Sequence, residues 1–184
     1  MRRFGRFGIL ATAAAAVLVT GCATRSVSSH IELGTDFARY RTYDWGVADA
    51  LPTGDVRLDN NAIFRDQFQG AIQKELATRR LVLTAEAPDL LIHTHTNVTR
   101  RLDVDTMPRE YPRCQGNGCP PTVQQYEIST LMIDVVDART KKLVWKAWSR
   151  DDLSGVIDDQ QRLRRAVTEA VADMMKLFPM RAAG

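Results

Sequence analysis

Two histidines, His93 and His95, are the residues of this sequence whose type and spacing suit a metal ion. They stand in a stretch of alternating polar and apolar residues, so they would project from one face of a strand, about 6.5 to 7 Å apart. Two imidazoles at that separation can share one zinc ion. The same alternation arises in any strand with one solvated face, and no recognised zinc spacing such as H-E-x-x-H is present. We therefore expect no metal and no cofactor, and a metal or small-ligand site at these histidines is the alternative.

A second kind of chemistry is covalent and concerns Cys22. A positive segment at the start of the chain is followed by an apolar run from Ile9 to Val19, which is shorter than the roughly 18 residues that span a bilayer. The stretch 19–22 (Val-Thr-Gly-Cys) resembles the lipobox of bacterial lipoproteins, in which the cysteine thiol is acylated and the cysteine becomes the first residue after cleavage. This resemblance implies a signal peptide over 1–21 and a lipidated tether over 22–27. An ordinary signal peptide with an incidental cysteine is the alternative.

The other two cysteines, Cys114 and Cys119, lie in a proline-rich stretch that we expect to form a loop from Met107 to Thr122. An exported protein meets an oxidising periplasm, which favours a disulfide between them. Closing so short a ring contributes roughly 2 kcal/mol, enough to stiffen a loop tip but not to hold a domain together. Because the spacing is C-x₄-C and not the C-x-x-C of thioredoxin-like proteins, a redox pair or a metal site is the lesser alternative.

Signatures of enzymatic chemistry are missing from the sequence. It has no G-x-S-x-G elbow, no S-x-x-K, no P-loop and no G-x-G-x-x-G. The acid pairs 151–152 and 158–159 consist of adjacent residues, which point apart on a strand end or a helix start and so do not form a glycosidase pair. Turn and helix N-terminal charges explain them better. We predict that the protein is not an enzyme.

Charge composition argues against nucleic acid as a partner. The chain has 25 lysine and arginine residues against 22 acidic ones, a formal net charge of +3. Three arginines and no acids fall within 1–21, so the chain that remains after cleavage is formally neutral. Basic residues gather in 100–113 and 162–165, where they form either a solvated face or a contact with anionic lipid or cell-wall polymer.

The periodicity of apolar residues predicts a single α+β domain over 28–180, a mostly antiparallel sheet with two amphipathic helices packed on one face. The strands are expected at Ser28–Leu33, Tyr40–Trp45, Leu81–Leu83, Asp89–Thr99, Glu127–Val136 and Lys142–Ser149. One helix starts after Asp59 or Asn60 and buries apolar residues from Ile63 to Leu76; the other starts after Asp158 or Asp159 and ends before Pro179. Trp145 and Trp148 fall on opposite strand faces, so one is expected in the core.

Several runs of the sequence resemble domain-of-unknown-function family 4136, which consists largely of bacterial lipoproteins. They are residues 36–45 (DFARYRTYDW), 87–92 (APDLLI), 131–140 (LMIDVVDART) and 143–148 (LVWKAW). The resemblance covers nearly the whole chain after residue 22 and implies architecture and compartment, but no catalytic residues. Arg80 stands where relatives often end the first helix with glycine, which argues against the usual left-handed cap there.

Together these features predict a non-enzymatic structural or interaction module of the cell envelope. A lipid on Cys22 would anchor it to a membrane, and Ala23 in place of an aspartate implies the periplasmic face of the outer membrane. Its expected partners are the membrane, through the lipid, and an envelope protein or the cell wall. A periplasmic metal-binding or small-ligand-binding lipoprotein is the alternative function.

Overall fold

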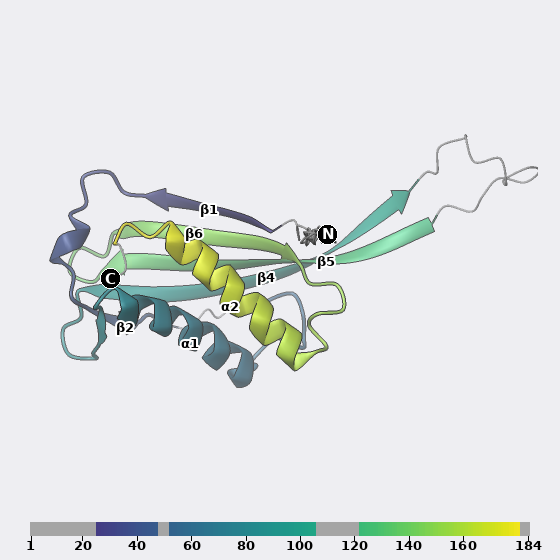
Figure 1. The fold of residues 1–184 in the computed structure, drawn as a ribbon, viewed down its shortest axis with the longest axis horizontal. Coiled ribbons are helices and arrows are strands. Elements are labelled where there is room, and N and C mark those ends of the chain that lie inside the picture. The colour runs from purple at the N-terminus through teal and green to yellow at the C-terminus, as the bar shows by residue number, and fades with distance from the viewer. Residues whose placement is uncertain (1–24, 48–51, 106–121, 181–184) are drawn as a thin grey trace, which may run out of the picture.

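The computed structural model describes residues 25–47, 52–105 and 122–180, which form one six-stranded sheet with two long helices on the same face (Figure 1). The strands are β1 Ser26–Ile31, β2 Thr42–Trp45, β3 Val82–Leu83, β4 Leu90–Asp105, β5 Thr122–Asp137 and β6 Leu143–Asp152. The helices are the 3-10 turn η1 Phe37–Arg39, α1 Ala62–Thr78 and α2 Gln160–Lys176. The predicted α+β class, with a mostly antiparallel sheet and both helices on one face, is confirmed.

The strand order is β1-β6-β5-β4-β2-β3, and the pairs β1–β6, β6–β5 and β5–β4 are antiparallel. The strand β2 is the exception, because it pairs in parallel with both β3 and β4. Parallel neighbours need a crossover connection, and α1 supplies it between β2 and β3. This crossover brings α1 onto the face of the sheet that α2 also covers.

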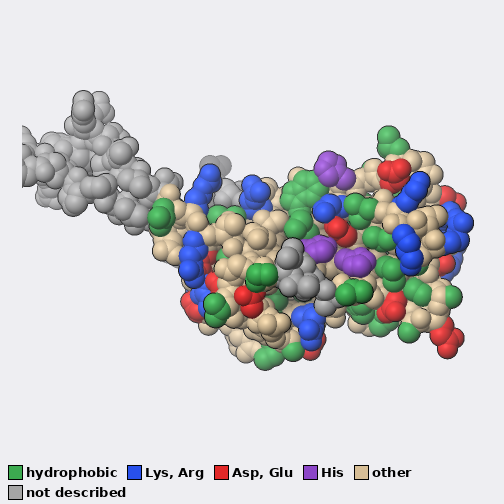
Figure 2. Space-filling view, turned by 180° about the vertical axis from the view of Figure 1, so that it is seen from behind, with side chains coloured by type: hydrophobic (Ala, Val, Ile, Leu, Met, Phe, Trp, Pro, Cys, Tyr) green, Lys and Arg blue, Asp and Glu red, His purple; other side chains and the backbone are tan. Residues whose placement is uncertain are grey.

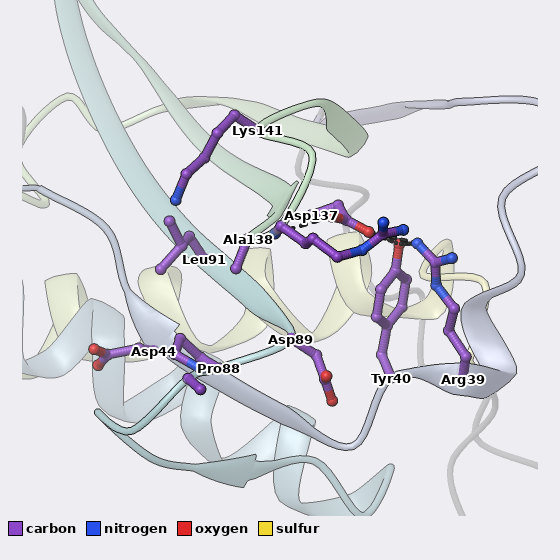
Figure 3. Close-up of a pocket in the computed structure, with 11 residues that line it drawn as sticks. Arg39, Tyr40, Asp44, Pro88, Asp89, Leu91, Asp137, Ala138 and Lys141 are labelled. Atoms are coloured by element: carbon purple, nitrogen blue, oxygen red, sulfur yellow. Dashed lines mark hydrogen bonds and ion pairs between the residues drawn. The ribbon is translucent and has the colours of Figure 1, made fainter.

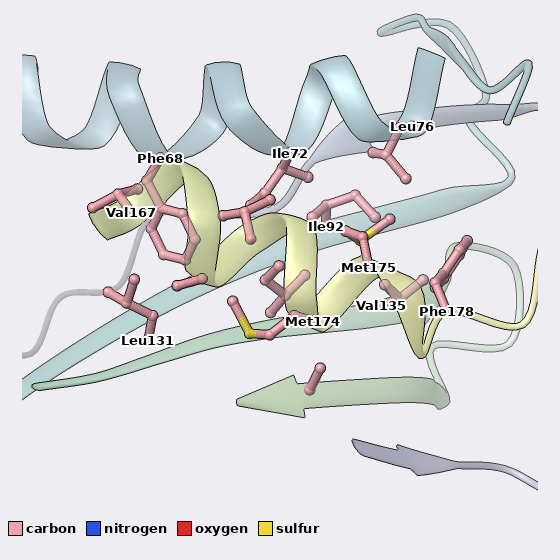
Figure 4. Packing of buried hydrophobic residues seen from close by; sticks show 14 of the residues in the cluster. Phe68, Ile72, Leu76, Ile92, Leu131, Val135, Val167, Met174, Met175 and Phe178 are labelled. Atoms are coloured by element: carbon pink, nitrogen blue, oxygen red, sulfur yellow. The ribbon is translucent and has the colours of Figure 1, made fainter. Parts of the chain in front are cut away.

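The core lies between this face of the sheet and the two helices (Figure 4). On α2 the buried side chains recur at helical spacing and form one stripe: Leu163, Val167, Ala170, Val171, Met174 and Met175. Asp159 caps this helix, since its carboxylate accepts from the backbone N–H groups of Gln161 at 2.9 Å and Arg162 at 3.0 Å. The helix ends at Lys176, three residues before Pro179, as the sequence predicts.

The two tryptophans of β6 divide between the faces, as predicted. Trp145 is 1% exposed and meets the ring of Phe178 edge-on, with centroids 4.9 Å apart. Trp148 lies half-buried on the helix-free face, where its ring is 5.0 Å from that of His30. One tryptophan therefore belongs to the core, and the other to the face that no helix covers.

The start of α1 differs from the prediction. Its capping residue is Asn61, whose side chain accepts from Phe64 N at 3.0 Å, and neither Asp59 nor Asn60 caps it. Asp59 is engaged elsewhere, because its carboxylate accepts from the backbone N–H of Thr53 at 2.6 Å. The prediction that Ile63 is buried is also wrong. The buried stripe of α1 repeats every four residues from Phe64, which leaves the Ile63 side chain 60% exposed.

The end of α1 corrects the expectation about Arg80. This residue has φ +63°, so the left-handed cap is present although the residue is not glycine. Arg80 N donates to Ala77 O at 3.0 Å and Leu81 N to Leu76 O at 3.1 Å, the two bonds of a Schellman motif. The motif also buries Leu81 against the helix end, to 4% exposure. These contacts offset the 1 to 2 kcal/mol that the left-handed backbone costs a non-glycine residue.

The strands β4 and β5 are longer than predicted and extend beyond the rest of the sheet (Figure 1). We call residues 100–105 and 122–127 the arm. They pair only with each other in the described part of the chain, because β6 reaches no further along β5 than Ile128. An isolated two-stranded ribbon is marginally stable. The arm therefore depends on its own pairing and on contacts at its base.

The chain enters the domain at Arg25, whose guanidinium contacts three carboxylates. Its Nε lies 2.9 Å from Asp151 Oδ2 on β6, and its Nη atoms lie 3.4 Å from Glu169 and from Asp173 on α2. These contacts join the start of β1 to both layers of the fold. Among the described helices, none is both long and apolar enough to cross a membrane.

Candidate functional site

The predicted histidine pair lies on the helix-free face of the sheet, together with His30 (Figure 2). His93 is paired across the strands with Asp134, and His30 with Lys146, in one row over the face. The carboxylate of Asp134 lies 3.6 Å from His95 Nε2 and 3.2 Å from Lys146 Nζ. The fold thus brings the two histidines beside one carboxylate, which a lysine also contacts.

This arrangement gives little support to a metal centre. No three or more histidine, cysteine or acidic side chains of the described chain are grouped so that they can hold a metal ion. The Lys146 ammonium opposes a cation at Asp134. The ring of His93 packs on the backbone of Gly46, since a Cβ at residue 46 would lie 2.2 Å from His93 Cε1. The histidines also lie outside the walls of the hollow described below.

The three cysteines fall outside the described residues. Lipidation of Cys22 and a disulfide between Cys114 and Cys119 therefore stay predictions from the sequence.

A hollow of about 710 Å³ lies elsewhere in the described structure, and no catalytic motif of the sequence points to it. It lies at one end of the sheet, where three segments distant in sequence meet (Figure 3). They are the stretch 39–44 from η1 to β2, the loop 87–89 that leads into β4, and the turn 137–141 between β5 and β6.

Asp137 is the central polar residue of this hollow. It is 3% exposed, and its carboxylate accepts from Tyr40 OH at 3.0 Å, from Arg39 at 2.5 Å and from Thr140 N at 2.7 Å. Burial opposes ionisation, but these donors and the charge of Arg39 outweigh it and lower the pKa of Asp137 to about 2. The carboxylate therefore stays charged at neutral pH and holds Arg39 and Tyr40 in place.

Asp89 joins the other two segments of the hollow. Its carboxylate accepts from the backbone N–H groups of Arg41 at 2.8 Å and Thr42 at 3.0 Å, and these bonds lower its pKa. Its carbonyl accepts from Ala138 N at 2.9 Å, across to the β5–β6 turn. The walls are thus fixed to one another by hydrogen bonds to one residue.

A separate ion-pair network supports the base of the arm. Arg57 contacts Asp55 at 2.6 Å, Glu127 at 2.7 Å and Asp158 at 2.8 Å, which joins a loop, β5 and the approach to α2. The arginine is the main cause that lowers the pKa of the buried Asp55 to about 2. Arg100, part of the basic stretch seen in the sequence, lies 3.8 Å from Glu127 at the edge of this network. The network thus holds the loop, β5 and the approach to α2 together at the base of the arm.

The described domain is an α+β protein with a six-stranded sheet and two helices on one face. The chain belongs to the family described as "Domain of unknown function (DUF4136)", whose family model matches residues 27–180. Tyr40, Asp89 and Asp137 of the hollow each fall in one of the runs that carry the resemblance to this family in the sequence. Those runs are the one sequence signal that points to the hollow.

Solved structures with the same arrangement are distant in sequence. A PDZ domain protein from Parabacteroides distasonis ATCC 8503 is 17% identical with a TM-score of 0.57, and the match covers 87% of this chain and 37% of that one. This likeness shows the fold alone.

Two further matches have lower TM-scores, and no inference is drawn from them. A PelC dodecamer from Paraburkholderia phytofirmans is 11% identical, with 87% and 99% of the two chains covered and a TM-score of 0.47. A minor lipoprotein from Acinetobacter baumannii is 10% identical, with 74% and 91% covered and a TM-score of 0.37. A comparison with curated proteins finds no match.

Proposed function

We propose that this protein is a non-enzymatic interaction module of the bacterial cell envelope, held at the periplasmic face of the outer membrane by a lipid on Cys22. The observation that carries the proposal is the helix-free face of the sheet, formed by β1, β6, β5 and β4, which no other described element covers (Figure 2). The anchor rests on the sequence of residues 1–23.

The composition of this face favours a protein partner. Trp148, Met132 and His95 form one cross-strand row of half-buried side chains at its centre. Charges of both signs surround them, among them Lys146 beside Asp134. Aromatic and methionine side chains at the centre with polar groups around them are typical of protein interfaces, whereas a surface for anionic lipid is uniformly basic.

The non-enzymatic part of the proposal is supported by the state of the buried acids. Asp55 and Asp137 are held by arginines so that their pKa values are about 2. An efficient general acid or base needs a pKa near the working pH, so neither carboxyl group suits that task at neutral pH. The sequence adds no nucleophile motif.

Site-specific photo-crosslinking in cells tests the interaction surface. A photoreactive residue at Asn97, exposed on the helix-free face, is compared with one at Gln73, exposed on α1 on the opposite side of the domain. We expect a discrete protein adduct from position 97 and none from position 73. Trp148→Glu should weaken the adduct at 97, since it places a charge at the centre of the face. Adducts from both positions, or from neither, contradict the proposed surface.

A further inference from the structure

The hollow at the end of the sheet has cationic side chains on one wall, supplied by the β5–β6 turn. Arg139 and Lys141 both line it and both are exposed. Within the described residues neither side chain forms an ion pair or a hydrogen bond. Arg39 lies on the same hollow and keeps 47% of its side chain exposed while it contacts Asp137. Of these three cations, Arg139 and Lys141 therefore present positive charge that no carboxylate of the described residues neutralises.

Another wall presents the opposite charge. Asp44 on β2 accepts a hydrogen bond from the backbone of Trp45 and has no cation within ion-pair distance in the described part of the chain. Asp89 lies on the same side, where backbone N–H groups hold its carboxylate in the charged form. In Figure 3, Leu91 lies between Lys141 on one side and Asp44 with Pro88 on the other. The two unpaired charges are thus separated by an apolar floor.

The backbone around the hollow is in place before any ligand arrives. Ala87 and Lys141 have φ values of +45° and +58°, which are costly for residues other than glycine. The bond from Ala138 N to Asp89 O fixes the turn against the loop. A site whose walls are already ordered loses little conformational entropy on binding.

We propose that this hollow binds a zwitterionic ligand, an amino acid or a dipeptide with both termini free, with its carboxylate toward Arg139 and Lys141 and its ammonium toward Asp44. A purely anionic ligand would bring negative charge toward Asp44 and Asp89, and a purely cationic one would approach Arg139 and Lys141. A ligand with both charges satisfies both walls, and its aliphatic part contacts Leu91 and Pro88. The volume of about 710 Å³ falls in the range of small-molecule sites.

Calorimetric titration of the full chain in detergent micelles at pH 7 tests the inference with three probes. Alanyl-alanine carries both charges, its N-acetyl form only the carboxylate, and its C-terminal amide only the ammonium. We expect the dipeptide to bind and each blocked form to bind about tenfold more weakly or worse, since each lacks one charge-assisted contact. No binding of the dipeptide at millimolar concentration, or equal binding of a blocked form, overturns the proposal.

Substitutions then locate the binding. Lys141→Gln and Asp44→Asn should each weaken dipeptide binding about tenfold, and each should leave affinity for the probe that lacks the matching charge nearly unchanged. Lys142→Gln and Asp66→Asn are the controls, because both residues are exposed and lie outside the hollow. If the controls weaken binding as much as the test variants do, the dipeptide binds elsewhere and the assignment is wrong. This result is independent of the crosslinking at Asn97.

Discussion

Replacing Arg79 with methionine tests how the two helices are joined at their C-terminal ends. The guanidinium is 7% exposed and donates to three backbone carbonyls, those of Glu75 at 2.6 Å, Met175 at 2.7 Å and Met180 at 3.0 Å. The Nη1 atom also lies 2.9 Å from the Glu75 carboxylate. One side chain therefore links the last turn of α1 to Met175 at the end of α2 and to Met180 beyond it.

The expected loss in the free energy of unfolding depends on which interactions of Arg79 a methionine side chain can replace. Its side chain fills much of the volume of the arginine stem, so the main loss is the set of hydrogen bonds. A hydrogen bond with a charged partner contributes about 1.5 to 3 kcal/mol. With two bonds that cross to the α2 end, we expect Arg79→Met to lower the free energy of unfolding by about 3 to 5 kcal/mol. That is a large part of the 5 to 15 kcal/mol typical of a domain.

Urea unfolding of the chain from Ala23 onward, followed by circular dichroism, measures this loss. The control is Arg65→Met on the same helix, because Arg65 is 53% exposed and lies 3.9 Å from Asp66, a pair that contributes little. We expect the control to change the free energy of unfolding by less than about 0.5 kcal/mol. A loss below about 1 kcal/mol for Arg79→Met, or similar losses in the two variants, would refute the reasoning.

Three further predictions concern the anchor, the cysteine loop and acid. Cys22→Ser should leave an unprocessed or soluble species, whereas an intact mass that shows an unmodified N-terminus in the unaltered protein would exclude lipidation. Alkylation of periplasmic material before and after reduction should differ by two thiols, at Cys114 and Cys119; two thiols that react without reduction would exclude the bridge. Because the pKa values of Asp55 and Asp137 are lowered from 3.8 to about 2, their stabilisation is full above about pH 4 and is lost as the pH falls toward 2. Asp137→Asn should flatten that decline in the free energy of unfolding, and an unchanged acid profile in this variant would contradict the assigned role.

The elements that the sequence predicts best are those whose periodicity and end signals agree. The helix α2 has a regular apolar stripe, an aspartate at its start and a proline after its end, and all three are found in the structure. For α1 the sequence offers Asp59 or Asn60 as the cap, but Thr53 engages Asp59 and the next residue along, Asn61, caps the helix instead. Arg80 adopts a left-handed backbone conformation because Leu81 is buried against the helix end. Local sequence propensities do not take such a tertiary contact into account.

The hollow is beyond local sequence reasoning for a different reason. Asp137 ends a strand, Asp89 precedes one and Tyr40 lies between a 3-10 turn and another strand, so none of the three is marked by the sequence as more than a residue at the end of an element. The parallel pairing of β2 with β4 brings these three residues together, and that pairing depends on the path of α1. The histidine pair, in contrast, is predicted from the sequence, because alternation along one strand places both side chains on one face.

The contacts of Arg25 have a mechanical consequence. A pull on the preceding chain reaches the domain at this residue, immediately before β1 at the free edge of the sheet. A load across the sheet would open the bonds to β6 one after another, starting from Ser26, whereas a load along the strand strains all of them at once. The guanidinium holds residue 25 to Asp151, Glu169 and Asp173, so these contacts bear the force before the first backbone bond can open. A side chain outside the strand thus protects the edge of the sheet against a pull on the chain that precedes it.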